Sequence, residues 1–438
     1  MNDFPNSVKE TLLSLVRSIA GSLELYVKNP GKDFTRDRKL TLENVILLII
    51  CMGGNSVYSE LLESKGLAAD TATTSAFVQQ RDKILRFAFE FLLREFTRSF
   101  DGPRRFMGYR LLAADGSDLP IATNPGDTET YYNTGSGRKG YNLLHLNATY
   151  DLLNRMYADI CVQPGNCQNE NKALCDMVGR SGIEGNVIVL CDRNYESYNN
   201  FAHIENRGWH YVIRVKDIES RCGILKGLGL RQSGEFDVRV RRILTKKLTN
   251  EIKAQPDVYK YISSKSTFDF LDRQTSPFYP ISFRVVRIML ENGAYESVVT
   301  NLDELDFPPS VIKKLYGMRW GIETSFRELK YTVGLTSFHA RKREYIVQEV
   351  FARVIMYNFT EIITSHVVIS KTGCKYPQRV NFTVAVFICK RFLRTRDNAR
   401  PPDVEALIRK NTLPVRSGRS NVRKLRNQTA VSFLYRVA

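Results

Sequence analysis

The chain has 438 residues, of which 43% are hydrophobic, and a formal net charge of +18. A chain of this length is expected to form two to four domains or subdomains. The excess of basic residues indicates a polyanionic partner, and nucleic acid is favoured over a membrane; the alternative is a globular protein that is merely basic. The longest uncharged apolar run, 45–52, is too short to cross a bilayer, and the N-terminus lacks a signal-peptide pattern. The eight cysteines occur singly, which argues against a disulfide scaffold or a zinc site. We therefore expect an intracellular protein.

Residues 1–105 are predicted to form a helical N-terminal domain. An apolar run that Thr41 opens is followed by short helical segments near 56–65 and from about 70–74 onward. This spacing fits a helix-turn-helix with the stretch 73–81, which carries Gln79, Gln80 and Arg81, as the candidate recognition helix; a plain helical bundle fits equally well.

From residue 106 the pattern changes to strands. Runs at 109–115, 141–151, 155–162, 186–192 and 209–215 read as strands, and helical stretches lie at about 168–180 and 195–205. The run 186–192 is almost entirely apolar, which is typical of a strand buried on both faces. The order β, β, β, α, β, α, β is that of an RNase H-like fold. We therefore predict an α/β class with a mixed five-stranded sheet as the core over residues 106–215.

The remaining chain divides into three parts. Strand-like runs predict a β-rich insertion at 216–300, and a helix after Pro308-Pro309 begins the last core helices at 301–365. The segment 366–438 contains sixteen Lys or Arg and three Asp or Glu, a net charge of +13. Within it, 415–426 is either a flexible phosphate-binding arm or a disordered basic tail without specific contacts.

The stretch 316–330 carries a polar stripe beside its apolar face. On a regular helix its polar members fall within about 60° of one another; they are Tyr316, Arg319, Glu323 and Lys330. An adjacent stripe of apolar residues is expected to face the core. Glu328 points elsewhere and is expected at the surface. An ordinary helical ion-pair stripe is the structural alternative.

Two further carboxylates follow apolar strands. Asp115 and Asp192 each come at the end of such a run, where the edge of a sheet is open to solvent. Each alone is more often a cap or turn residue. Together with Glu323 they could hold two Mg²⁺ or Mn²⁺ ions, which take oxygen ligands and support in-line displacement at phosphorus. Asp118 is a rival to Asp115, which we favour because it comes first after the apolar run.

The spacing Y-x2-R-x3-E-x6-K of the polar stripe resembles the signature of the insertion-sequence-4-type DDE transposases. The stretches "ADGSD" and "CDRNYES" are similar to that family's two Asp motifs, and the resemblance extends over about residues 30–365. It implies a metal-binding triad of Asp115, Asp192 and Glu323. The β-rich insertion between the second Asp and the Glu is also shared, whereas the segment after about 370 matches nothing in the family.

The resemblance also implies DNA contacts. Arg319, Lys330 and Tyr316 would hold backbone phosphates near the cleaved end. Trp320 would stack a flipped base, unless it is an ordinary core residue. Arg138 and Lys139 would contact the backbone, unless their loop is simply solvated.

The implied function is cut-and-paste transposition. Metal-dependent hydrolysis would cleave double-stranded DNA at the inverted-repeat ends of an insertion sequence, and the 3′-hydroxyl would be transferred into target DNA. A homodimer would act on paired ends, and the N-terminal helices would bind the repeats. The protein would work in the bacterial cytoplasm, on the nucleoid and not on a membrane. The alternatives are a catalytically silent DNA-binding descendant of a transposase and another RNase H-like nuclease.

Overall fold

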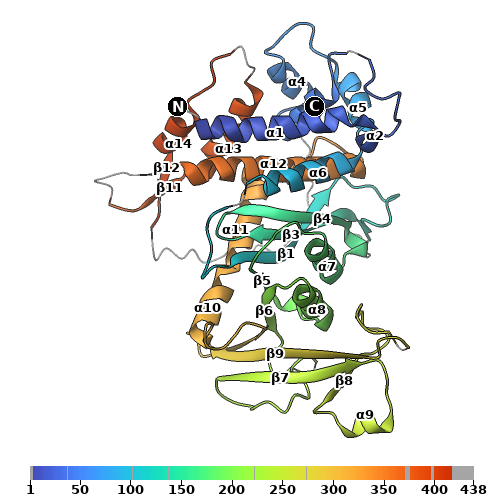
Figure 1. Ribbon diagram of the computed structural model, residues 1–438. Coiled ribbons are helices and arrows are strands. Elements are labelled where there is room, and N and C mark those ends of the chain that lie inside the picture. Colours follow the sequence, from blue (N-terminus) through green and yellow to red (C-terminus); the bar gives the residue numbers. More distant parts are fainter. Residues whose placement is uncertain are drawn as a thin grey trace.

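The computed structural model describes residues 3–416 except for residues 37, 101, 134, 136–138, 221, 273, 370–374 and 396–398. The helices from both ends of the chain lie together at the top of Figure 1, and the strands extend below them. The N-terminal helices are α1 (Asp3–Gly21), α2 (Leu23–Tyr26), α3 (Leu42–Cys51), α4 (Val57–Ser64), α5 (Thr74–Asp82) and α6 (Arg86–Arg98). Thr41, Ser56 and Thr73 each cap the helix that follows by accepting a backbone N–H bond.

A mixed sheet forms between residues 110 and 215. Its strands are β1 (Arg110–Ile121), the short β2 (Tyr131–Tyr132), β3 (Tyr141–Asp151), β4 (Met156–Pro164), β5 (Val187–Cys191) and β6 (His210–Val215). β3 pairs antiparallel with β1 and β4, whereas β1, β5 and β6 are parallel neighbours. The resulting order is β4-β3-β1-β5-β6. Every residue of β5 is buried, as its apolar run predicts. The predicted α/β class and mixed sheet are confirmed.

The sheet is larger than predicted. The strands after β6 are β7 (Phe236–Thr245), β8 (Tyr259–Tyr261), β9 (Phe278–Met289) and β10 (Tyr295–Thr300), with the short helix α9 (Asn250–Ala254) between β7 and β8. β10 pairs antiparallel with β6, so the sheet continues in the order β6-β10-β9-β7-β8. The five predicted core strands are present, but the sheet does not end with them: ten strands are joined in the described residues, because β10 of the predicted β-rich insertion pairs with β6.

Helices cover both faces of the core sheet. They are α7 (Glu170–Gly179), α8 (Tyr198–Asn206), α10 (Pro309–Met318), α11 (Trp320–Glu328), the π-helical turn η3 (Leu329–Val333) and α12 (Arg343–His366). Alternate residues of β1 serve the two sides: Ala113 packs in the cluster that contains α11 and α12, whereas Leu112 and Ala114 pack with α7 and α8. The cluster around α12 also contains α1, α3 and α6, so the N-terminal helices share its hydrophobic core.

The residues expected to read DNA from α5 mostly face inward. Gln80 and Arg81 are buried, and the Arg81 guanidinium donates to Gln348 Oε1 and Glu349 Oε1 on α12, at 2.9 Å each. Arg81 therefore holds α5 against α12, whereas Gln79 is exposed, and the helix-turn-helix stays a prediction. The packing fits the helical-bundle alternative.

Part of the basic C-terminal segment is folded. It contains β11 (Gln378–Val380), α13 (Phe382–Arg394), α14 (Val404–Lys410) and β12 (Thr412–Pro414), and α13 buries Ile388, Cys389 and Phe392 in the core shared with α12. Of the expected arm at 415–426, the residues from 417 onward lie outside the described residues. Among the helices that the structure describes, none combines the length and apolar character that a bilayer span needs.

Candidate active site

The sheet register brings Asp115 and Asp192 together. Ala114 of β1 pairs with Cys191 of β5, and each Asp is the next residue on its own strand or just beyond it. Neighbouring strands lie about 4.8 Å apart, so the two carboxylates lie at the same edge of the parallel pair. Asp192 also accepts a bond from the backbone N–H of Asn194, at 2.9 Å. β1 does not end at Asp115 as predicted, because β3 continues to pair with it as far as Ile121.

Helix α11 adds Glu323 to this edge. α11 packs against β1. Arg319 lies at the junction of α10 and α11, and its side chain reaches from there to β1. The Arg319 guanidinium donates to Glu323 Oε1 at 3.0 Å, and its Nη1 lies 3.9 Å from Asp115 Oδ2. Arg319 is only 6% exposed, so this bridge is largely shielded from water.

The three carboxylates are electrostatically coupled. Burial raises the pKa of Asp115 to about 6, and the negative charges of Asp192 and Glu323 add to that effect. The Gly116 N–H and the Arg319 guanidinium act in the opposite direction. Arg319 contacts two of these three acidic groups, so negative charge is in excess, which is the charge pattern of a site that attracts further cations.

The donor chemistry of this site fits a hard divalent ion. Mg²⁺ and Mn²⁺ take carboxylate oxygens, and all three groups supply them. In the part of the chain that the structure describes, no three Asp, Glu, His or Cys side chains are already arranged as a metal cage. The Arg319 guanidinium instead donates to Glu323 and lies beside Asp115. A cation held by both carboxylates would have to displace it.

The rest of the polar stripe departs from a straight helix. The break at Arg319 and the π-helical turn after Glu328 alter the regular angular spacing. Tyr316 is buried, and its hydroxyl has no hydrogen-bond partner among the described residues. Lys330 Nζ donates to the Asp118 carbonyl at 2.8 Å, and burial lowers the pKa of this amine. A phosphate contact by Tyr316 would require its hydroxyl to become accessible.

The predicted base-stacking residue lies at the surface. Trp320 is 58% exposed, so the alternative of a buried core tryptophan is wrong. The Arg319 guanidinium lies 5.1 Å from the centre of its ring. Lys139 is exposed, whereas Arg138 lies outside the described residues.

Asp118 lies on the other face of β1 from Asp115. Its carboxylate contacts His145 Nδ1 at 2.7 Å, and His145 Nε2 contacts Glu170 Oε1 of α7 at 3.0 Å. A Cβ on Gly116 would come within 2.4 Å of both Glu170 Oε1 and His145 Nε2, which explains why glycine follows Asp115. Strand alternation, which separates positions 115 and 118, is the signal by which the sequence could have excluded the rival aspartate.

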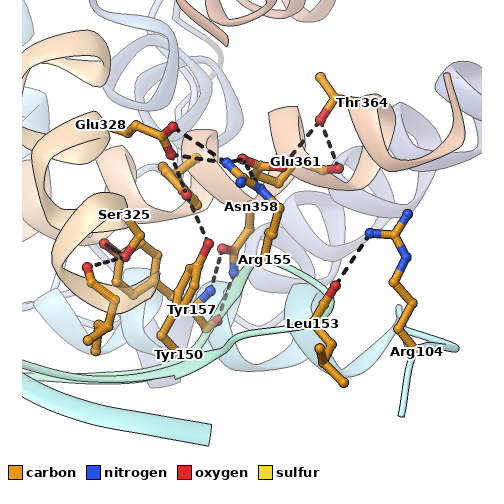
Figure 2. Close-up of polar contacts among 12 residues, drawn as sticks. Arg104, Tyr150, Leu153, Arg155, Tyr157, Ser325, Glu328, Asn358, Glu361 and Thr364 are labelled. Carbon is orange, nitrogen blue, oxygen red and sulfur yellow. Dashed lines mark hydrogen bonds and ion pairs between the residues drawn. The ribbon is translucent and has the colours of Figure 1, made fainter. Parts of the chain in front are cut away.

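Glu328 was expected at the surface and is instead part of a polar network. Its side chain is 20% exposed and accepts bonds from Arg155 Nη2, at 3.2 Å, and from the Tyr357 hydroxyl, at 3.0 Å (Figure 2). The partners come from the β3–β4 turn and from α12. Nothing in local helical periodicity reveals contacts over such sequence distances, so sequence reasoning missed Arg155 and Tyr357.

Comparisons with known proteins identify the family. Residues 106–359 match the transposase DDE domain, which is more than half of the chain. The transposase InsG for insertion sequence element IS4 of Escherichia coli strain K12 is 23% identical over 131 residues; that stretch is 30% of this chain and spans only 29% of the relative's length. A solved piggyBac transposase synaptic complex with hairpin DNA has a TM-score of 0.46 and 10% identity, covering 93% of this chain and 81% of that one. The chain belongs to the transposase DDE domain family, in agreement with the insertion-sequence-4-type signature of its sequence.

Proposed function

We propose that the chain is a DNA transposase that cleaves at the inverted-repeat ends of an insertion sequence and transfers the 3′-hydroxyl into target DNA. The observations that carry this proposal are that the β1–β5 register sets Asp115 beside Asp192 and that Arg319 links Glu323 to Asp115, from three distant segments within the family's matched region. The strand order β4-β3-β1-β5-β6 supports an RNase H-like core for this site.

The proposed chemistry divides between the carboxylates and the cationic side chains. When bound at Asp115, Asp192 and Glu323, two Mg²⁺ or Mn²⁺ ions would activate water or a 3′-hydroxyl and stabilise the leaving oxygen. Arg319, released from the carboxylates, would turn its fork of donors to a backbone phosphate. Lys330 would hold another backbone phosphate as a point charge. The buried setting strengthens these charge interactions relative to bulk water.

The proposed DNA contacts extend beyond the scissile phosphate. The exposed ring of Trp320 would stack an unpaired base next to the cleaved end. Arg138 and Lys139 would follow the backbone from the β2–β3 connection, and the N-terminal helices would bind the repeats through exposed side chains. Two copies of the chain would act together, because the two element ends must be cut in one complex.

The test uses a supercoiled plasmid that carries the gene with its genomic flanks. The full chain with Mg²⁺ is expected to release the element, and Asp115→Ala, Asp192→Ala or Glu323→Ala is expected to lower cleavage by about 10³-fold or more while sparing DNA binding. Glu291→Ala, an exposed carboxylate in the β9–β10 turn, is the matched control. DNA binding without cleavage by the unaltered chain would indicate the silent alternative. Cutting of plasmids that lack the element's ends would indicate another RNase H-like nuclease.

A further inference from the structure

The helix that carries Glu323 lies between two irregular turns of a longer helical run. Arg319, whose backbone is helical, joins α11 (Trp320–Glu328) to α10, and α11 continues into the π-helical η3. Both junctions depart from regular α-helical spacing, so tertiary contacts are needed to fix the rotation of the segment between them. The contacts behind α11 therefore determine where the Glu323 carboxylate points.

Three positions on the rear of α11 meet the β3–β4 hairpin. Gly321, Ser325 and Glu328 have the i, i+4, i+7 spacing of one helical stripe, which excludes Glu323. A Cβ at Gly321 would lie 2.7 Å from Leu152 Cδ2, so the hairpin turn packs directly on the helix backbone.

The other two contacts join α11 to β4 and to the turn before it. The Ser325 and Tyr157 hydroxyls are 2.9 Å apart, and Ser325 donates its own hydrogen to the Ile322 carbonyl at 2.7 Å. Tyr157 must therefore donate to Ser325. Arg155 reaches Glu328 at 3.2 Å, one turn further along α11 (Figure 2).

The hairpin is itself held firmly by α12. The Arg155 Nη2 and Nε atoms donate to Glu361 Oε1 at 2.7 and 3.0 Å. Asn358 bonds both the backbone N–H and the carbonyl of Tyr157, at 2.9 Å each. Tyr157, Asn358 and Glu361 are buried, so these bonds are shielded from water.

We propose that the β3–β4 hairpin positions Glu323 for metal binding, with Tyr157 and Arg155 as positioning residues that fix the rotation of α11. The rear stripe holds the helix, and Glu323 on another face is thereby aimed at Asp115. Loss of one rear bond lets α11 rotate and moves a metal ligand without touching it. This inference rests on the proposed metal-dependent function of the same site.

The test compares two buried tyrosines of one cluster. Tyr157→Phe removes the bond to α11, whereas Tyr150→Phe removes only a bond to Tyr357, at 3.1 Å. Binding of Mn²⁺ to the full chain is measured by the electron spin resonance of free Mn²⁺, with thermal melting in parallel. We expect Tyr157→Phe and Ser325→Ala each to weaken Mn²⁺ binding by about tenfold, as loss of outer-shell partners does. The Tyr150→Phe variant should stay close to the unaltered chain.

The double variant Tyr157→Phe/Ser325→Ala should bind Mn²⁺ no more weakly than either single variant, because both remove the same bond. Equal Mn²⁺ affinity in the Tyr157→Phe and Tyr150→Phe proteins would overturn the inference. If the unaltered chain binds Mn²⁺ no better than its Glu323→Gln variant, both the metal site and its positioning fail. If the Mn²⁺ results follow expectation but the plasmid stays uncut, the positioning stands and the proposed reaction fails.

Discussion

The acidic side chains on the two faces of β1 have different electrostatic surroundings. On the face toward α7, the His145 imidazole lies between Asp118 and Glu170 and the Lys330 amine bonds the Asp118 carbonyl, so two carboxylates have two cationic groups beside them. On the face toward α11, Arg319 contacts Glu323 and Asp115, and Asp192 adds a third negative charge. A balanced cluster stabilises the fold, whereas an excess of negative charge is stable only with further cations. Charge balance, and not the mere presence of aspartate, distinguishes the candidate site from its structural neighbour.

The most direct test of this difference between the two clusters is to neutralise one aspartate on each face of β1. Asp115→Asn is expected to reduce Mg²⁺-dependent plasmid cleavage by about 10³-fold with little loss of stability, because it removes a proposed metal ligand. Asp118→Asn is expected to lower the melting temperature and to leave cleavage within about tenfold, because its partner is His145. Comparable cleavage by the two variants would mean that the faces have the same role.

The balanced face predicts a pH dependence of stability. Burial disfavours the charged form of His145, but its bonds to Asp118 and Glu170 outweigh that effect and raise its pKa to about 9. The folded-state pKa lies above the ordinary value of 6.5, so the stabilisation is full below that pH and is lost as the pH rises through about 9. Lys330, whose amine bonds the Asp118 carbonyl, is a further titratable group at this cluster, and Tyr132 and Tyr195 lie near its carboxylates.

The expected loss in the free energy of unfolding between pH 6 and pH 9.5 is on the order of 2 kcal/mol. Urea unfolding at the two pH values measures it. In the His145→Gln variant this pH-dependent loss should be much smaller. An unchanged pH profile in that variant would assign the effect to other groups.

Replacing Arg319 tests the excess negative charge of the candidate site directly. Arg319→Gln removes the cation that competes for Asp115 and Glu323. The DNA-free chain should therefore bind Mn²⁺ about threefold to tenfold more tightly. The same variant should bind DNA more weakly, with a salt slope smaller by about one. Weaker Mn²⁺ binding by Arg319→Gln would show that the guanidinium supports the metal site instead of competing with it.

Trp320 gives the smallest expected change in stability. Because its ring is 58% exposed, Trp320→Ala should alter the free energy of unfolding by less than about 0.5 kcal/mol. If the ring stacks an unpaired base, the variant should nevertheless weaken complexes with element ends that carry unpaired terminal bases, by about 1–3 kcal/mol. Trp209 is buried, so Trp209→Phe serves as the control that should affect stability first.

Local patterns were enough to find most of the helices and strands of the core, whereas the roles of the candidate site residues stay predictions. Residues 187–191 form the predicted buried strand, and Thr41 and Thr73 cap helices close to where the sequence indicates. These features depend on residues within one or two turns of each other, which periodicity and capping rules describe. The extension of the sheet by β10 was missed, because pairing of Ser297 with Val215 joins segments that local patterns treat separately.

The sequence by itself determined which groups could bind metal and phosphate, because strand ends and helical spacing depend on near neighbours. Tertiary structure alone decided that Arg319 bridges Asp115 and Glu323 and that Tyr157 contacts the rear of α11. The contact between Tyr157 and Ser325 spans 168 positions in the chain. Side-chain bonds over such separations arise only when the packed core brings their elements together.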